Sequence, residues 1–155
     1  MRPNIGKIIS GGQSGADRAA LSAAVKHKIP YGGYCPKGGW AEDMTVPPGI
    51  RKEYPLLRET ESTDPSERTV LNVLSSDATL IFFYGNSPGT KLTLDECRRR
   101  NRPVFLFDEE MSTSSVEKWL ESLGPNPVLN IAGPRESENP GIYEKVSQVL
   151  DSLLE

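Results

Sequence analysis

Short apolar runs alternate with longer segments of helical periodicity along this chain of 155 residues. Apolar runs bounded by turn residues predict strands at about 7–11, 31–35, 78–84, 103–107 and 128–133. Apolar positions at helical spacing predict helices at about 15–28, 66–76, 90–100, 115–123 and 141–154, the third of which could also start near residue 93. The 78–84 run is the most hydrophobic and is typical of a central strand covered on both faces.

This alternation predicts one α/β domain over residues 1–155, a doubly wound, mostly parallel five-stranded sheet with helices on both faces. If the five strands are numbered along the chain, their expected order across the sheet is 2-1-3-4-5. Such sheets bind ligands beyond the carboxyl ends of their strands, where the direction of winding reverses. With this order the reversal falls between the strands at 7–11 and 78–84, and a glycine-containing turn follows each of them.

The segment 36–65 interrupts the alternation, because glycine and proline recur through it and break any long element. We expect a long irregular excursion with a short strand near 56–57. Long loops inside a small domain are often functional.

The turn after the first strand carries the strongest candidate chemistry. Its residues are Gly11, Gly12, Gln13, Ser14 and Gly15. Backbone N–H groups at a helix start hold anions, and glycine allows close approach and positive φ. A helix start that binds nothing could use the same residue types, and Ser14 with Asp17 also forms an S-x-x-D capping pattern. Asp17 therefore either caps the helix or accepts a hydrogen bond from a ligand amine or hydroxyl.

Further candidate binding residues lie in the second turn and in the excursion. They are Asn86, Ser87, Gly89 and Thr90, and then Lys37 and Trp40. Lys37 could pair with a phosphate and Trp40 could stack on a planar ring, although a solvated lysine and a loop-packing tryptophan are the alternatives. We interpret Arg135, in the turn after the last strand, as a solvated side chain.

Charge and composition narrow the classes of function. The formal net charge of −3 argues against a nucleic-acid partner. No apolar run is long enough to span a membrane and no signal-peptide pattern begins the chain, so we expect a cytoplasmic protein. Cys35 and Cys97 lack metal-ligand spacing, which indicates inert apolar positions and no protein-ligated metal. The lone His27, at a predicted helix end, lacks the partners of a catalytic histidine.

Three segments together resemble the molybdenum-cofactor carrier family: S-G-G-Q-S-G-A-D-R-A-A-L at 10–21, C-P-K-G-G-W-A-E-D at 35–43 and S-P-G-T-K-L-T at 87–93. That family is similar to a larger Rossmann-like group, which includes cytokinin-activating phosphoribohydrolases and lysine-decarboxylase-like proteins. The resemblance implies that the two glycine turns bind a phosphorylated pterin or nucleotide-like ligand, usually in a homo-oligomer.

The sequence departs from the phosphoribohydrolase motif P-G-G-x-G-T-x-x-E. Pro88-Gly89-Thr90 is shorter, and Thr93 stands where the glutamate would be. This favours a carrier of molybdenum cofactor or a related ligand over an enzyme, with a molybdoenzyme as a possible acceptor. The alternative is an N-glycosidic or phosphate-ester hydrolase of nucleotides, whose candidate carboxylates are Asp17, Glu42, Asp43 and Asp95. A ligand sensor that acts through a partner is the third hypothesis.

Overall fold

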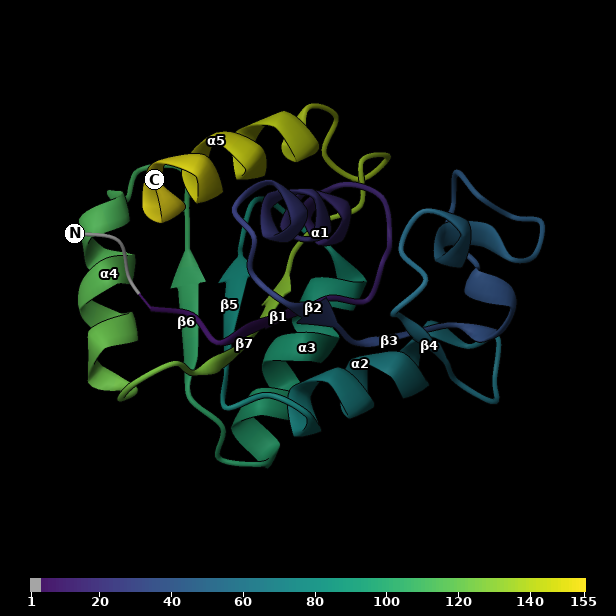
Figure 1. Cartoon of the computed structure of the whole chain (residues 1–155), viewed down its shortest axis with the longest axis horizontal. Helices are drawn as coiled ribbons and strands as arrows, with labels where there is room; N and C mark the ends of the chain where they lie inside the picture. The colour runs from purple at the N-terminus through teal and green to yellow at the C-terminus, as the bar shows by residue number, and fades with distance from the viewer. Residues whose placement is uncertain (1–3) are drawn as a thin grey trace.

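The computed structural model describes residues 4–155 and is built around a five-stranded, all-parallel sheet (Figure 1). Across the sheet the strands are β2 (Tyr31–Gly32), β1 (Lys7–Ile9), β7 (Val128–Ala132), β5 (Ala78–Phe82) and β6 (Val104–Phe107). Every residue of β5 is buried, as expected for a strand covered on both faces. The predicted α/β class is confirmed.

Helices cover both faces of the sheet. In Figure 1, α1 (Ala16–Lys26) and α5 (Ile142–Leu154) lie above it, and α2 (Pro65–Leu74) and α3 (Pro88–Arg99) lie below it. The remaining helix, α4 (Thr113–Ser122), packs against α5 and β6. Alanines in α1, including Ala20 and Ala24, are fully buried, because small side chains let this helix approach its neighbours closely.

The expected strand order is wrong, because the last strand of the chain lies in the middle of the sheet. β7 pairs with β1 on one side, Ile8 opposite Leu129, and with β5 on the other, Leu80 opposite Ile131. If the strands are counted from β7, the order becomes 3-2-1-4-5, which is that of the Rossmann sheet. The reversal of winding therefore lies between β7 and β5, rather than between β1 and β5.

The predicted strand at 31–35 divides into two strands that belong to different sheets. β2 pairs with β1, whereas β3 (Tyr34–Cys35) pairs with β4 (Arg58–Glu59) in a separate two-stranded sheet. The break falls at Gly33, whose φ is 127° and whose close approach to the carbonyl of Ser10 leaves no room for a Cβ.

Short ordered elements occur within the excursion. It contains the short 3₁₀ helices η1 (Lys37–Gly39) and η2 (Gly49–Lys52), and its strand β4 starts two residues after the predicted 56–57. Ile50 and Leu57 pack with Leu21 of α1 and with Cys35 in a small apolar cluster. This cluster holds the excursion beside the first glycine turn.

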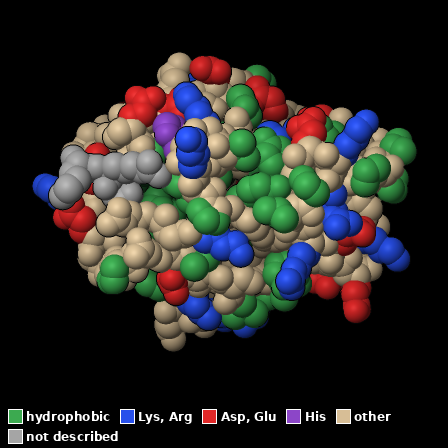
Figure 2. Space-filling model, viewed as in Figure 1, with side chains coloured by type: hydrophobic (Ala, Val, Ile, Leu, Met, Phe, Trp, Pro, Cys, Tyr) green, Lys and Arg blue, Asp and Glu red, His purple; other side chains and the backbone are tan. Residues whose placement is uncertain are grey.

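The surface carries charges of both signs, which are distributed over the face seen in Figure 2. Within residues 4–155, no helix combines the length and hydrophobicity needed to cross a membrane. Both cysteines are buried, and burial raises the pKa of each thiol, in keeping with the inert role expected of them.

Candidate functional site

A crevice opens at the carboxyl ends of the central strands, between the loops that follow β1, β7 and β5. Its volume is about 80 Å³. The lining comes from the first glycine turn and α1 (Gly11, Gln13, Asp17), from α2 (Pro65, Ser66, Arg68, Thr69, Asn72), from the second turn and α3 (Ser87, Gly89, Leu92, Thr93) and from β7 with its following loop (Asn130, Ile131, Ala132, Gly133, Arg135, Glu138). The crevice thus lies at the topological switch point between β7 and β5, where doubly wound folds bind their ligands.

The N–H groups of the first glycine turn are largely engaged by the protein itself. Gly12 N donates to Ser10 Oγ (3.2 Å), Gln13 N to Asp17 Oδ2 (3.3 Å) and Ser14 N to Gln13 Oε1 (3.1 Å). The predicted Ser14–Asp17 cap does not form, because Gly15 is the N-cap residue of α1 and Ser14 Oγ donates to Glu42 Oε2. These N–H groups therefore stabilise the turn itself, and they are not free to donate to a ligand in the crevice.

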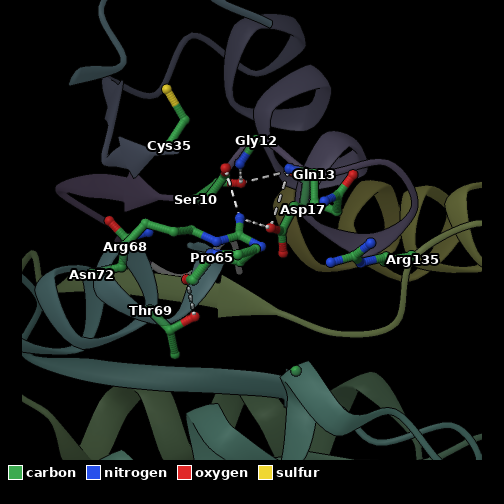
Figure 3. A network of polar contacts seen from close by, with 12 residues as sticks. Ser10, Gly12, Gln13, Asp17, Cys35, Pro65, Arg68, Thr69, Asn72 and Arg135 are labelled. Atoms are coloured by element: carbon green, nitrogen blue, oxygen red, sulfur yellow. Dashed lines mark hydrogen bonds and ion pairs between the residues drawn. The ribbon is translucent and has the colours of Figure 1, made fainter. Parts of the chain in front are cut away.

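Arg68 is the main site residue that the sequence pattern does not predict (Figure 3). From α2 its Nη1 donates to the carbonyl of Gly11 (2.7 Å) and to Asp17 Oδ2 (3.0 Å). A Cβ at position 11 would collide with the guanidinium, so this contact requires glycine. The side chain of Arg68 is only 10% exposed, although a guanidinium is normally solvated or fully paired.

The one sequence signal for Arg68 is its spacing with two other polar residues. Arg68, Asn72 and Ser76 recur every four residues and are all buried, so they form a polar stripe on the inner side of α2 and its C-terminal end. Asn72 fixes β3 through both its amide atoms, at 2.7 Å from Tyr34 N and 3.0 Å from Tyr34 O. On sequence alone, such a stripe is indistinguishable from a solvated helix face.

Two buried nitrogen donors of the lining have no hydrogen-bond partner within the described chain. They are Arg68 Nε and Gln13 Nε2. Gln13 is 3% exposed, and its Oε1 accepts from Ser14 N (3.1 Å) and Glu42 N (2.8 Å), which leaves the amide nitrogen as the free end. Buried donors without acceptors are costly, and in native proteins they commonly mark a missing water, ion or ligand. Because one of the two donors belongs to the positively charged guanidinium of Arg68, the missing partner is best supplied by an anion.

The second glycine turn reaches the crevice through Ser87 and Gly89. Ser87 caps α3 by accepting from Thr90 N (3.3 Å), and its hydroxyl donates to Glu138 Oε1 (3.0 Å). Thr90 bonds back to Ser87 rather than lining the crevice, and Asn86 is exposed on the turn. The turn therefore contributes a helix start to the crevice. Of its four predicted binding residues, Ser87 and Gly89 line the crevice, whereas Asn86 and Thr90 do not.

The loop after β7 contributes Arg135, and its interpretation as a solvated side chain is wrong. Arg135 lines the crevice and lies over the ring of Trp40, 5.6 Å from the ring centroid. Trp40 therefore contacts the rim through Arg135, while Lys37 is exposed on η1 and lies outside the lining. Gly133 lets β7 pass close to α1 and β5, since a Cβ there would lie 2.6 Å from Ala16 Cβ and 3.1 Å from Phe82 Cβ.

Of the four carboxylates considered for hydrolysis, Asp17 alone lines the crevice. Burial raises the pKa of Asp17, against the opposing effects of Arg68 and the Gln13 N–H. Glu42 and Asp43 line a separate open cleft of about 530 Å³ with Tyr54 and Tyr143, and Asp95 is exposed on α3.

The two hydrolysis candidates in that cleft, Glu42 and Asp43, are held in the ionised form. Burial would raise the pKa of Glu42, but hydrogen bonds from Ser137 and Ser14 outweigh it and lower the pKa. Hydrogen bonds from Arg18 lower the pKa of Asp43. Neither group is suited to donate a proton near neutral pH.

His27 lies away from the crevice. Its Nε2 is 2.8 Å from Asp151 Oδ1, and His27, Asp151 and Glu155 are the one group of three possible metal-ligating side chains found within residues 4–155. The group lies at the C-terminal ends of α1 and α5, whereas the crevice lies at the start of α1.

The fold and crevice define a Rossmann-like α/β protein with a crevice at the topological switch point. Residues 8–154 match the family described as the circularly permutated YpsA SLOG family, and the chain belongs to that family. A permutation is consistent with a strand order that becomes 3-2-1-4-5 when read from β7.

The chain is also similar to a protein from Syntrophus aciditrophicus, whose crystal structure at 1.45 Å is described as that of a "putative molybdenum carrier protein". The two share 42% sequence identity with a TM-score of 0.90, over 100% of this chain and 98% of the other. The resemblance to the carrier family is thereby confirmed. No match was found among curated proteins.

Proposed function

We propose that this protein binds a phosphorylated pterin or nucleotide-like ligand, the molybdenum cofactor first among the candidates, and holds it by its phosphate in the crevice without turnover. The observation that carries the proposal is the pair of buried, unpartnered donors, Arg68 Nε and Gln13 Nε2, in the lining. A phosphate would supply acceptors to both donors and would lie beside the Arg68 guanidinium. Family membership and the name of the Syntrophus relative support the same class of ligand.

The size of the crevice limits what part of a ligand can enter it. Pockets that enclose small organic ligands have volumes of roughly 300–1,000 Å³, against about 80 Å³ here. The crevice therefore suits the phosphate end, while the ring system would lie outside it, towards Trp40 and Arg135 at the rim. The molybdenum cofactor would bring its own metal, and this chain would supply donors to its phosphate.

Among the residues proposed from the sequence, Gly11, Gln13, Asp17, Ser87 and Gly89 lie at the crevice. Gln13 is the donor, and Gly11 makes room for Arg68. Asp17 holds Arg68 in place through Oδ2. Gly12, Ser14 and Gly15 shape the turn behind this arrangement.

Hydrolysis of a nucleotide is the second candidate function, and one observation favours it. Asp17 combines a place in the crevice with a raised pKa, as a general acid requires. Its Oδ2 is already bonded to Arg68 and to the Gln13 N–H, which favours a structural role over proton transfer.

A ligand panel with a product assay separates the two functions. Thermal unfolding would be followed with molybdenum cofactor, molybdate, AMP, ADP-ribose, NAD and ribose 5-phosphate, with released base and phosphate measured in the same wells. A ligand that binds the native state raises Tm by mass action. Stabilisation by the pterin cofactor without product supports the carrier. Stabilisation by a nucleotide with product release overturns it in favour of the hydrolase, and no stabilisation by any ligand overturns both.

A further inference from the structure

A tight turn at residues 41–44, called here the Glu42 turn, bridges the two loops on either side of the crevice. Ala41 and Met44 pair through reciprocal backbone hydrogen bonds of 3.1 and 3.0 Å, which places Glu42 and Asp43 at the tip. The turn belongs to the excursion, and its tip lines the open cleft on the side of the molecule where α1 and α5 begin. It contributes no residue to the crevice itself.

Glu42 contacts both loops through its side chain. Its Oε2 accepts from Ser14 Oγ (2.8 Å) on the loop after β1, and its Oε1 accepts a short hydrogen bond from Ser137 Oγ on the loop after β7. Ser14 Oγ in turn accepts from Glu136 N (3.2 Å). A single carboxylate therefore ties together the loops that carry Gln13 and Arg135.

The backbone of the same residue acts on Gln13. Glu42 N donates to Gln13 Oε1 at 2.8 Å, the shorter of the two hydrogen bonds that hold this oxygen. Gln13 lines the crevice, and with Oε1 held on the side of the Glu42 turn, Nε2 is the amide atom left without a partner. Trp40, two residues before Glu42, packs against the guanidinium of Arg135 from the same segment.

We propose that Glu42 is a positioning residue for the anion crevice: its carboxylate fixes the spacing of the two rim loops, and thereby sets the affinity of a site that it does not touch. The inference rests on the proposed function, and it assigns the positioning of that site's two rim loops to the excursion. Sites that must hold donors within a fraction of an ångström depend on supporting hydrogen bonds of this kind.

Asp43 provides a matched control, because it anchors the same turn without touching either rim loop through its carboxylate. Its two oxygens accept from Arg18 Nη1 and Nη2, both at 2.9 Å. Asp43→Asn weakens this anchor and leaves the Glu42 contacts in place. If a general loosening of the turn weakens binding, affinity should fall in both Asp43→Asn and Glu42→Ala. If the spacing of the two loops is what matters, affinity should fall only in Glu42→Ala.

The test measures binding of AMP and inorganic phosphate by calorimetry to the full chain and to Glu42→Ala, Glu42→Gln, Ser137→Ala, the double variant Glu42→Ala/Ser137→Ala and Asp43→Asn. We expect the Kd of Glu42→Ala to rise about tenfold, that of Glu42→Gln to rise less because one acceptor oxygen remains, and that of Asp43→Asn to stay within about twofold. The double variant should bind like the weaker single variant, because both changes break one contact.

The outcomes separate the inference from the function on which it rests. If the unaltered chain binds neither probe, the proposed phosphate site fails and the inference fails with it. If the unaltered chain binds but Glu42→Ala binds equally well, or the Asp43→Asn loss matches it, the positioning role is overturned while the phosphate site stands. The positioning role would also be overturned if the losses of binding free energy in Glu42→Ala and Ser137→Ala added up in the double variant.

Discussion

Gln13→Glu changes the proposed phosphate site by a single atom, since the two side chains have the same shape. The variant keeps Oε1, the acceptor for Ser14 N and Glu42 N, and replaces the unpartnered Nε2 donor with a second oxygen. The internal hydrogen bonds of the turn are thus retained while the crevice loses a donor and gains a negative charge. Glu138→Gln is the converse change, because it removes a negative charge from the lining and keeps the acceptor for Ser87 Oγ and Arg135 N.

The magnitudes follow from the kind of contact that each change affects. Loss of a hydrogen bond to a charged group costs about 1.5–3 kcal/mol. Repulsion between unit charges about 4 Å apart adds up to about 4 kcal/mol at an effective dielectric constant of 20. A combined loss of about 4 kcal/mol raises Kd roughly a thousandfold. Glu138 is exposed, so its neutralisation should tighten binding by at most about 1 kcal/mol, or roughly fivefold.

Calorimetric titration with AMP at pH 7.5 measures both effects, and urea unfolding shows whether each variant is folded. If Gln13→Glu does not fold, Arg68→Lys replaces it, because lysine keeps the positive charge near Asp17 but lacks Nε. That variant should lose one charge-assisted hydrogen bond, about 10- to 100-fold in Kd. Unchanged affinity in a folded Gln13→Glu, or weaker binding in Glu138→Gln, would refute the placement of the phosphate beside Gln13.

Three further predictions concern stability. Arg68→Met should lower the free energy of unfolding by about 3–5 kcal/mol, because Asp17 stays buried without its partner. Urea titrations should show a smaller loss of stability at pH 5.5 than at pH 8, since protonation neutralises Asp17 in the variant. An equal loss of stability at the two pH values would contradict this. Gly133→Ala should cost about 1–3 kcal/mol through overpacking, whereas Gly89→Ala, whose Cβ would meet no atom within 4 Å, should be neutral or stabilising by up to about 1 kcal/mol; equal melting temperatures would contradict this. The lowered pKa of Glu42 means that its contribution to stability is complete above the ordinary carboxyl pKa and is lost as the pH falls through the lowered value. Glu42→Gln should therefore flatten the acid limb of the pH–stability profile below about pH 5. Parallel profiles for the variant and the unaltered chain would argue against this role.

The elements of the fold could be predicted because each depends on a local pattern. Residues 78–84 form an apolar run bounded by turns, and β5 lies within it and is buried throughout. The glycine run at 11–15 predicts a strand, a turn and a helix start, and the structure has β1, the turn and α1 there. The helix boundaries differ from the predicted ones by no more than two residues when the third helix is taken to start near residue 90. Ser87 caps α3 two residues earlier, and Asp64 caps α2 one residue earlier, than the apolar pattern suggests.

The candidate site could be predicted only in part, because a residue's neighbours along the chain do not reveal which distant backbone it approaches. The glycine turn predicts room for a ligand at Gly11, but that room is taken up by Arg68, 57 residues away. The local sequence predicts a solvated Arg135, whereas the side chain lies over the ring of Trp40 at the rim. In both cases an arginine in a polar context carries no mark of the distant residue that it contacts.

The sequence by itself determined the α/β class, the places of the strands and helices, the glycine turns and the family, all of which are recorded in short-range patterns and motifs. Only the tertiary structure decided that β7 lies between β1 and β5, which moves the switch point to the loop carrying Arg135. The physical reason is that parallel strands pair through non-local hydrogen bonds, and each apolar strand has the same local pattern wherever it enters the sheet. The same limit applies to the buried donors of Arg68 and Gln13, whose lack of partners is a property of the assembled crevice.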